Sequence, residues 1–115
     1  MSESCLFCRI AAGKLQADIV SESKDGLAFR DIHPQSPVHI LVIPKKHIAS
    51  LHAAGESDAA LLGNLLHWSA RIAADQSLMP GGYRIVTNCG PQAGQSVDHL
   101  HLHLLGGRQL QWPPG

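Results

Sequence analysis

Apolar and polar residues alternate, or form short apolar runs, in five segments separated by turn-forming residues. Residues 39–43 are almost wholly apolar and end at Pro44, a pattern typical of a central strand. Asp25-Gly26 lies between two such segments and is a strong hairpin signal. The pattern predicts strands over residues 18–23, 27–31, 39–43, 83–89 and 97–105.

A longer period indicates one extended helix. Four apolar residues recur at i, i+4, i+7 and i+11, namely Leu61, Leu65, Trp68 and Ile72. This spacing predicts an amphipathic helix of about five turns, with Ser57 as its N-cap. Residues 5–12 predict a short N-terminal helix that ends near Gly13. The order of strands, long helix and strands indicates an α+β fold with a mainly antiparallel sheet.

Length and composition narrow the function classes. The 115 residues suffice for a single domain spanning 1–115, and 44% hydrophobic with 16% charged residues is ordinary for a globular protein. Nine basic residues balance nine acidic ones, so no net field favours nucleic acid or an anionic membrane. The sequence shows no signal peptide and no apolar run of membrane-spanning length, and three cysteines do not form a disulfide framework, so we expect a cytoplasmic protein.

The most informative segment is the run His99-Leu100-His101-Leu102-His103-Leu104-Leu105. In a strand the three histidines would share one face, roughly 6.5–7 Å apart, and the leucines the other. Imidazoles that close cannot all be charged, so some are neutral and able to act as nucleophile, base or metal ligand. A solvated run, a metal site and catalysis at phosphorus are the alternatives. The Gly-rich loop at residues 90–96 favours the last, because its amides can bind phosphate.

Several motifs together resemble the histidine triad superfamily, whose signature is H-φ-H-φ-H-φ-φ with φ apolar. The similar stretches are residues 7–10, 28–32, 37–48, 82–84 and 94–108. The C-terminal Gly106-Gly107-Arg108-Gln109 and Trp112-Pro113-Pro114-Gly115 resemble the histidine triad nucleotide-binding branch. The resemblance implies a HIT-like fold, a homodimer, and purine nucleoside phosphoramidase activity that requires no cofactor. AMP-type purine nucleotides would be the ligands.

By that resemblance, His101 is the nucleophile that attacks the α-phosphorus and forms a nucleotidyl-histidine intermediate. This chemistry needs a neutral attacking nitrogen, so we expect a backbone carbonyl to hold the other ring nitrogen as a donor. Further catalytic residues would be His103, His39, His99 and Ser96, with His103 and Ser96 on the phosphate oxygens together with the amides around Gly94, Gln95 and Ser96.

For the nucleoside, Asp31 would bind the ribose, Phe29 and Ile32 would sandwich the base, and Asn88 would reach ribose or phosphate. The purely structural alternatives are that Asp31 forms a turn and that Phe29 and Ile32 are core residues. Trp112 lies in a tail that in the family can approach the partner's active site.

A second chemical feature is Cys5-Leu6-Phe7-Cys8, half of a tetrahedral zinc site. Bacterial-type members of the superfamily pair such cysteines with two histidines, which here correspond to His47 and His99. The resemblance thus implies a structural Zn²⁺ held by Cys5, Cys8, His47 and His99. Two reduced cysteines without metal, or a redox dithiol, are the alternatives.

Two residues depart from the family pattern, and two other functions remain open. Asp98 stands where relatives often have an aromatic residue, and Arg30 where some have histidine, which leaves base and leaving-group preference undecided. The first alternative function is a nucleotide-binding or scaffolding protein with incidental catalysis. The second is a dinucleoside polyphosphate hydrolase or nucleotidyl transferase of the same superfamily.

Overall fold

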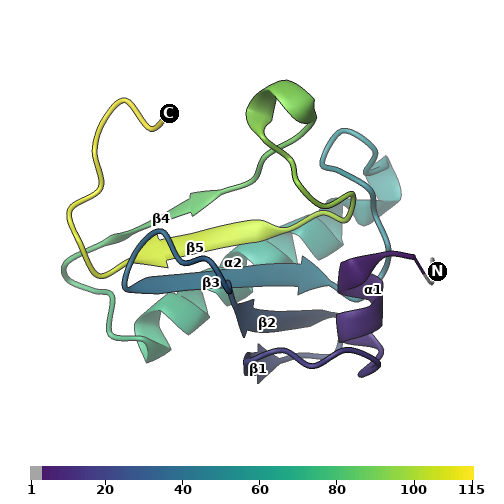
Figure 1. The fold of residues 1–115 in the computed structure, drawn as a ribbon, viewed down its shortest axis with the longest axis horizontal. Helices are drawn as coiled ribbons and strands as arrows, with labels where there is room; N and C mark the ends of the chain where they lie inside the picture. Colours follow the sequence, from purple (N-terminus) through teal and green to yellow (C-terminus); the bar gives the residue numbers. More distant parts are fainter. Residues whose placement is uncertain (1–3) are drawn as a thin grey trace.

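A five-stranded antiparallel sheet forms the centre of the computed structural model, which describes residues 4–115 (Figure 1). The strand order is β1-β2-β3-β5-β4. The strands are β1 (Ile19–Glu22), β2 (Gly26–Arg30), β3 (Val38–Pro44), β4 (Tyr83–Val86) and β5 (Leu102–Gly106). The helices are α1 (Leu6–Ala11) and α2 (Ala59–Asp75), with short 3-10 turns η1 (Glu56–Asp58) and η2 (Pro91–Ala93). The predicted α+β fold is confirmed. Residues 1–3, which the predicted domain of residues 1–115 includes, lie outside the described residues.

The two faces of the sheet are covered by different helices. Ile40 and Val42 of β3 face α2 and pack against Leu65 and Ile72. Leu41, the residue between them, faces the other way and joins the cluster that contains α1. This double burial explains why residues 40–43 of β3 are continuously apolar rather than alternating.

The strand predicted over residues 97–105 begins only at Leu102, so that part of the prediction is wrong. Leu100 donates its amide to the carbonyl of Ile48, beyond the end of β3, at 2.6 Å. The ring of His99 contacts the carbonyl of Pro44 at 2.8 Å. These contacts draw residues 99–101 away from the β3 ladder, and the strict alternation of faces is lost. The strand predicted over residues 83–89 likewise ends at Val86.

The long helix begins later than predicted. Ser57 lies inside η1, and α2 starts at Ala59 with Asp58 before it. The Asp58 carboxylate accepts the Gly55 amide at 2.9 Å and the Lys46 ammonium at 2.6 Å, and these bonds lower the pKa of the carboxyl. Asp58, rather than Ser57, is therefore the N-cap residue of α2. The predicted apolar stripe is confirmed, with Leu65 and Ile72 fully buried.

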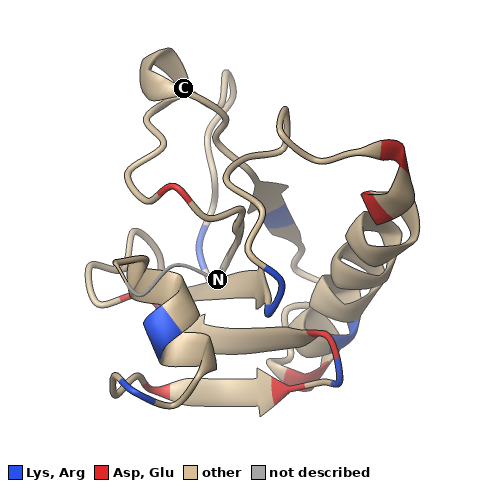
Figure 2. Ribbon diagram, turned by 90° about the vertical axis from the view of Figure 1, so that its right-hand side faces the viewer, with Lys and Arg blue, Asp and Glu red and all other residues tan. Residues whose placement is uncertain are grey.

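Figure 2 shows that basic residues and acidic residues each occur on several elements of the chain. Within residues 4–115, no helix combines the length and the hydropathy that a bilayer crossing requires.

Candidate active site and metal cluster

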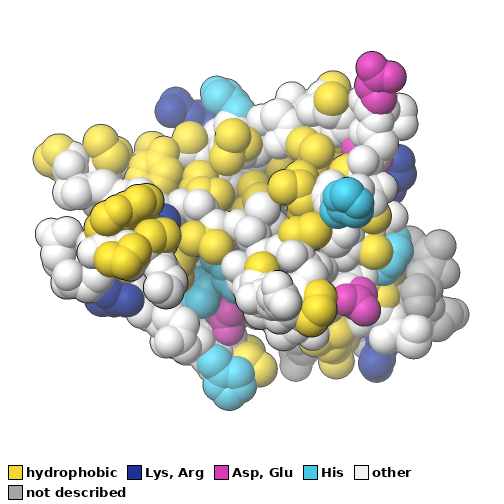
Figure 3. Space-filling view, turned by 90° about the horizontal axis from the view of Figure 1, so that it is seen from above, with side chains coloured by type: hydrophobic (Ala, Val, Ile, Leu, Met, Phe, Trp, Pro, Cys, Tyr) yellow, Lys and Arg dark blue, Asp and Glu magenta, His cyan; other side chains and the backbone are white. Residues whose placement is uncertain are grey.

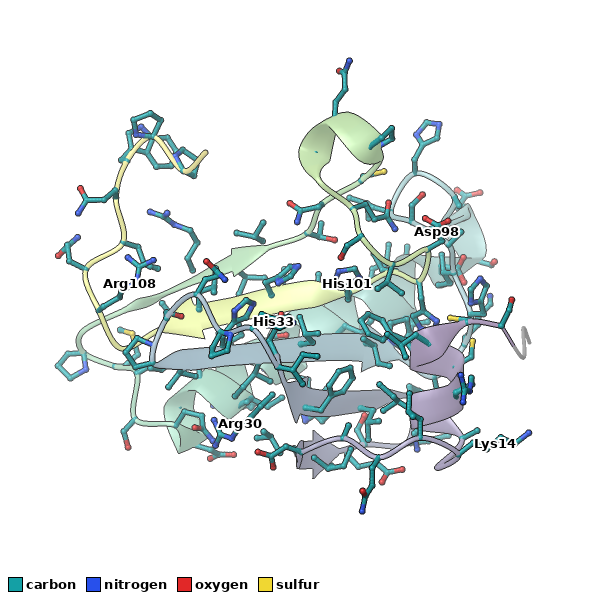
Figure 4. All side chains as sticks on the ribbon, in the orientation of Figure 1. Lys14, Arg30, His33, Asp98, His101 and Arg108 are labelled. Carbon is teal, nitrogen blue, oxygen red and sulfur yellow. The ribbon has the colours of Figure 1, made fainter. Side chains whose placement is uncertain are left out.

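His101 lies immediately before β5, with 3% of its surface exposed. Its Nδ1 is 2.7 Å from the backbone carbonyl of His99. A carbonyl oxygen can only accept, so Nδ1 carries the proton, and in the neutral ring Nε2 carries the lone pair. The structure thus supplies the carbonyl expected from the sequence, and His101 presents a nitrogen that can act as a nucleophile or base (Figure 4).

A second pair of imidazoles is ordered by a backbone amide. The Gln35 N–H donates to His39 Nδ1 at 3.0 Å, so the proton of neutral His39 lies on Nε2. That nitrogen is 2.9 Å from His103 Nδ1, which must therefore accept. The proton of His103 is consequently on its Nε2, which is buried and has no partner within residues 4–115. A buried donor of this kind is costly unless a ligand supplies an acceptor.

Burial keeps these rings neutral. It is the main cause that lowers the pKa of His103 to about 4; the neighbouring His101 and His39 act in the same direction, and Asp31 opposes them. Burial also lowers the pKa of His39, although the Asp31 carboxylate 3.4 Å away favours its charged form. The hydrogen-bond pattern above is therefore the one expected at neutral pH.

A cavity of about 350 Å³ is lined by Phe7 and Asp31, which contact the site histidines, although His39, His101 and His103 do not themselves line it. It contains four predicted residues, Phe29, Asp31, Ile32 and Ser96. Its apolar wall also includes residues that the sequence analysis did not assign to the site, namely Phe7, Ile10, Leu15, Leu41 and Val97. The volume and the mostly apolar lining suit a small organic ligand with a few polar groups.

Two side chains connect this cavity with the histidines. The Phe7 ring from α1 packs edge-on against Phe29 and His101, with ring centroids 5.5 and 5.1 Å apart. Asp31, just after β2, accepts the His33 amide through Oδ1 at 2.8 Å and directs Oδ2 toward His39. Asp31 is therefore both a turn former and a polar group at the cavity. Phe7 stands within the quoted motif of residues 7–10, but its contact with His101 has no sequence signal.

Other predicted ligand residues lie apart from the cavity. Gly94 and Gln95 donate their amides back into the loop at 3.1 Å, to Pro91 and Gly90. The Gln95 side chain accepts the Gly90 amide and donates to the carbonyls of Ala49 and Val97. This loop thus holds its own shape, and Ser96 is its member that reaches the cavity. Asn88 is half-buried after β4, and Trp112 is 80% exposed in the C-terminal tail, so neither lines it.

Cys5 and Cys8 lie close to two histidines, His47 and His99. The Nδ1 atom of His99 lies 3.4 Å from Cys5 Sγ, 3.5 Å from Cys8 Sγ and 3.2 Å from His47 Nδ1. Cys8 Sγ is 3.2 Å from His47 Nδ1. Ligands of a tetrahedral zinc are roughly 3.3–3.8 Å apart, so the four atoms fit one metal ion closely. The Pro44 carbonyl on His99 Nε2 holds the proton there and leaves Nδ1 as a ligand.

His99 therefore departs from the predicted arrangement of three histidines on one face. Its ring pairs with His47, with centroids 5.0 Å apart, whereas His101 pairs with His103 at the same separation. Burial is the main cause that lowers the pKa of His99, so its ring is neutral as metal ligation requires. A second group, Asp31, His39 and His103, is also compact. The Gln35 amide places the His39 proton on the nitrogen facing that group, which disfavours a metal there.

Comparison with known proteins gives a consistent result. The HIT domain model matches residues 12–110. An uncharacterised HIT-like protein of Synechococcus elongatus is 56% identical over 115 residues, covering 100% of both chains. A HIT family hydrolase from Legionella pneumophila superposes with a TM-score of 0.96 at 52% identity, covering 97% of this chain and 100% of that one. A histidine triad protein from Clostridium difficile gives 0.94 at 37% identity, with 96% of each chain covered. This chain belongs to the HIT domain family.

Proposed function

We propose that the protein is a hydrolase that cleaves purine nucleoside phosphoramidates at the α-phosphate through His101. The carrying observation is the bond from His101 Nδ1 to the His99 carbonyl, which holds the proton on Nδ1 and leaves Nε2 as the atom that can attack from the neutral ring. The adjacent cavity supplies apolar walls for a purine, and Asp31 supplies a carboxylate for the ribose hydroxyls. The structural neighbour from Legionella pneumophila is a HIT family hydrolase, which supports the reaction class.

The reaction proceeds in two displacements. His101 Nε2 bonds to the α-phosphorus while the bond from phosphorus to the amine nitrogen breaks, and the amine takes up a proton from solvent water as it leaves. The His103 Nε2–H donates to a phosphate oxygen, which satisfies its orphaned donor. The Ser96 hydroxyl lies in the same cavity. Water then bonds to phosphorus, the bond to His101 breaks, and the nucleoside monophosphate is released.

Turnover of a defined substrate tests this proposal. A lysine conjugate of AMP joined through a P–N bond is incubated with the purified protein, and AMP release is followed by chromatography. Acid quenching during turnover, followed by mass spectrometry, should find a nucleotidyl group on the peptide that contains His101. AMP binding without turnover would contradict the phosphoramidase proposal and favour a nucleotide-binding protein. Turnover of dinucleoside polyphosphates alone would favour the other hydrolase branch.

We also propose that Cys5, Cys8, His47 and His99 hold a structural zinc ion. Bound zinc would join α1 to the segments after β3 and before β5, because its ligands come from all three. Cys5, Cys8 and Cys89 are not joined in disulfide bonds, which suits the reducing cytoplasm expected from the sequence. We expect the purified protein to retain about one zinc per chain, as measured by elemental mass spectrometry.

Cys8→Ser should remove most of this zinc and lower the melting temperature. Cys89→Ser is the matched control, since Cys89 lies after β4 and outside the cluster. Equal zinc content in both variants, or a wild type that retains no zinc after gel filtration, would contradict the structural-zinc proposal.

A homodimer is the proposed assembly, formed along the free edge of β4. This edge strand has β5 on one side only. Beside it, an apolar groove runs between α2 and the sheet, lined by Leu51, Leu62, Leu66, Ile85 and Leu102 among others. Figure 3 looks onto this side and shows hydrophobic side chains gathered across its upper half. A second copy related by a twofold axis would continue the sheet and cover the groove with its own matching surface.

Leu66 is 53% exposed, and we expect Leu66→Glu to convert the dimer to a monomer in sedimentation experiments. Ile19→Glu is the control, because Ile19 is similarly exposed, at 47%, on β1 at the opposite edge of the sheet. A monomeric wild type, or an unchanged dimer in Leu66→Glu, would contradict the assembly.

A further inference from the structure

An arginine outside the triad clamps the loop between β2 and β3. Arg108 follows β5, and its Nε and Nη2 donate to the Gln35 carbonyl at 3.1 and 3.0 Å. Its Nη1 donates to the Gln109 carbonyl at 2.9 Å, which orients the guanidinium. Figure 4 shows the Arg108 side chain directed toward the loop that carries His33. Two donors of a rigid fork on a single carbonyl fix that peptide more firmly than a lysine could.

Gly107 permits this approach. Its φ is +92°, a backbone conformation that side-chain-bearing residues rarely adopt. A Cβ at this position would lie 2.9 Å from Pro37 Cβ in the same loop. Both observations show that the chain turns sharply after β5 and passes directly against the loop between β2 and β3.

Gln35 links this clamp with the histidines, because its carbonyl and its amide point to different partners. The carbonyl accepts from Arg108, and the amide donates to His39 Nδ1 at 3.0 Å. The amide occupies the lone pair of His39 Nδ1 and so favours the proton on Nε2, where the Asp31 carboxylate 3.4 Å away also favours it. Through the 2.9 Å contact, the His103 proton then lies on its own Nε2. A displaced Gln35 would allow the opposite pattern, with His103 Nδ1 donating to His39 and a lone pair on His103 Nε2.

We propose that Arg108 is a positioning residue that, through Gln35 and His39, keeps His103 as a hydrogen-bond donor toward the substrate phosphate. This inference rests on the proposed function for its ligand, but the chain of contacts itself does not. In the reversed pattern, a lone pair on His103 would face a phosphate oxygen. One donor would then be lost and a repulsion gained at the atom where charge develops.

The decisive measurement is the protonation pattern of the imidazole nitrogens, read from long-range ¹H–¹⁵N NMR correlations at neutral pH. In the wild type, His39 and His103 should both show a protonated Nε2 and an unprotonated Nδ1. In Arg108→Ala we expect the two forms to exchange, with averaged ¹⁵N shifts for both residues. Arg71→Ala, at an exposed arginine of α2, should leave the wild-type pattern intact.

Kinetics provide a second readout. Arg108→Ala should lower kcat by about 10- to 100-fold with a smaller change in KM, since the lost donor acts mainly on transition-state charge. Arg108→Lys keeps the charge but not the two-pronged geometry, so it should restore only part of the rate. Unchanged ¹⁵N shifts in a folded Arg108→Ala would overturn the positioning role. If the wild type shows no turnover, the NMR result still decides this inference, while the proposed function fails separately.

Discussion

His101→Ala is expected to lower kcat/KM for an AMP–lysine phosphoramidate by on the order of 10⁴-fold or more. In the proposed mechanism, the alanine removes the atom that bonds to phosphorus, so the two-step route would be lost altogether. AMP binding should change little, because the cavity walls come from Phe29, Asp31 and other residues that remain. Steady-state kinetics and calorimetric binding of AMP measure the two effects separately.

His52→Ala is the matched control for this experiment, since His52 is exposed in the loop before α2. It should retain wild-type turnover. A folded His101→Ala that keeps turnover within tenfold of the wild type would eliminate His101 as the nucleophile. Loss of both turnover and AMP binding, with an altered circular dichroism spectrum, would indicate damage to the fold, and His101→Gln would then be used to repeat the test.

Acidification should destabilise the folded protein between pH 7.5 and 5. The pKa of His103 falls from 6.5 to about 4 on folding, so in this range the unfolded chain binds the proton and the folded chain does not. Stability is therefore fully present above pH 6.5 and is lost as the pH falls toward 4. Between pH 7.5 and 5, His103 alone should cost roughly 2 kcal/mol. His39 and His99, whose pKa values are also lowered, act in the same direction.

Urea unfolding at the two pH values measures this loss. His103→Asn should show a smaller decrease in unfolding free energy than the wild type at equal protein and zinc concentrations. The comparison cancels any contribution from the Cys/His cluster, which both proteins contain. His52→Asn controls for the removal of a histidine at an exposed position. Equal pH dependence in the wild type and His103→Asn would show that His103 is not held neutral in the folded protein.

The sequence predicts best those elements whose residue pattern is determined by side-chain burial. The apolar run of β3 and the stripe of α2 are both determined by which faces the sheet and helix bury, and burial leaves a direct pattern in the sequence. The limits of β5 and α2 were predicted less well. They depend on single polar contacts, such as the Leu100 amide with the Ile48 carbonyl and the Gly55 amide with the Asp58 carboxylate, which leave no periodic pattern in the sequence.

The residues of the candidate site also differ in how well the sequence predicts them. Histidines and cysteines are rare and chemically distinctive, so His101, His103, His39 and the Cys/His cluster could be named from their motifs. Gln35 and the His99 carbonyl act through the backbone, which every residue possesses, and no residue type announces that role. Gly94 and Gln95 show the converse. Their amides were expected to bind phosphate, but the loop uses them to close its own turn.

His99 belongs to two sites at once, through different atoms. Its Nδ1 faces the cysteines, and its carbonyl oxygen orients His101. Replacing the cluster with apolar residues would therefore also alter the peptide whose carbonyl orients His101. A transplanted triad would need the cysteine-bearing helix with it. The two centres are therefore structurally coupled. In a survey of variants, substitutions of Cys5 and Cys8 should be tolerated less when activity is selected for than when folding alone is.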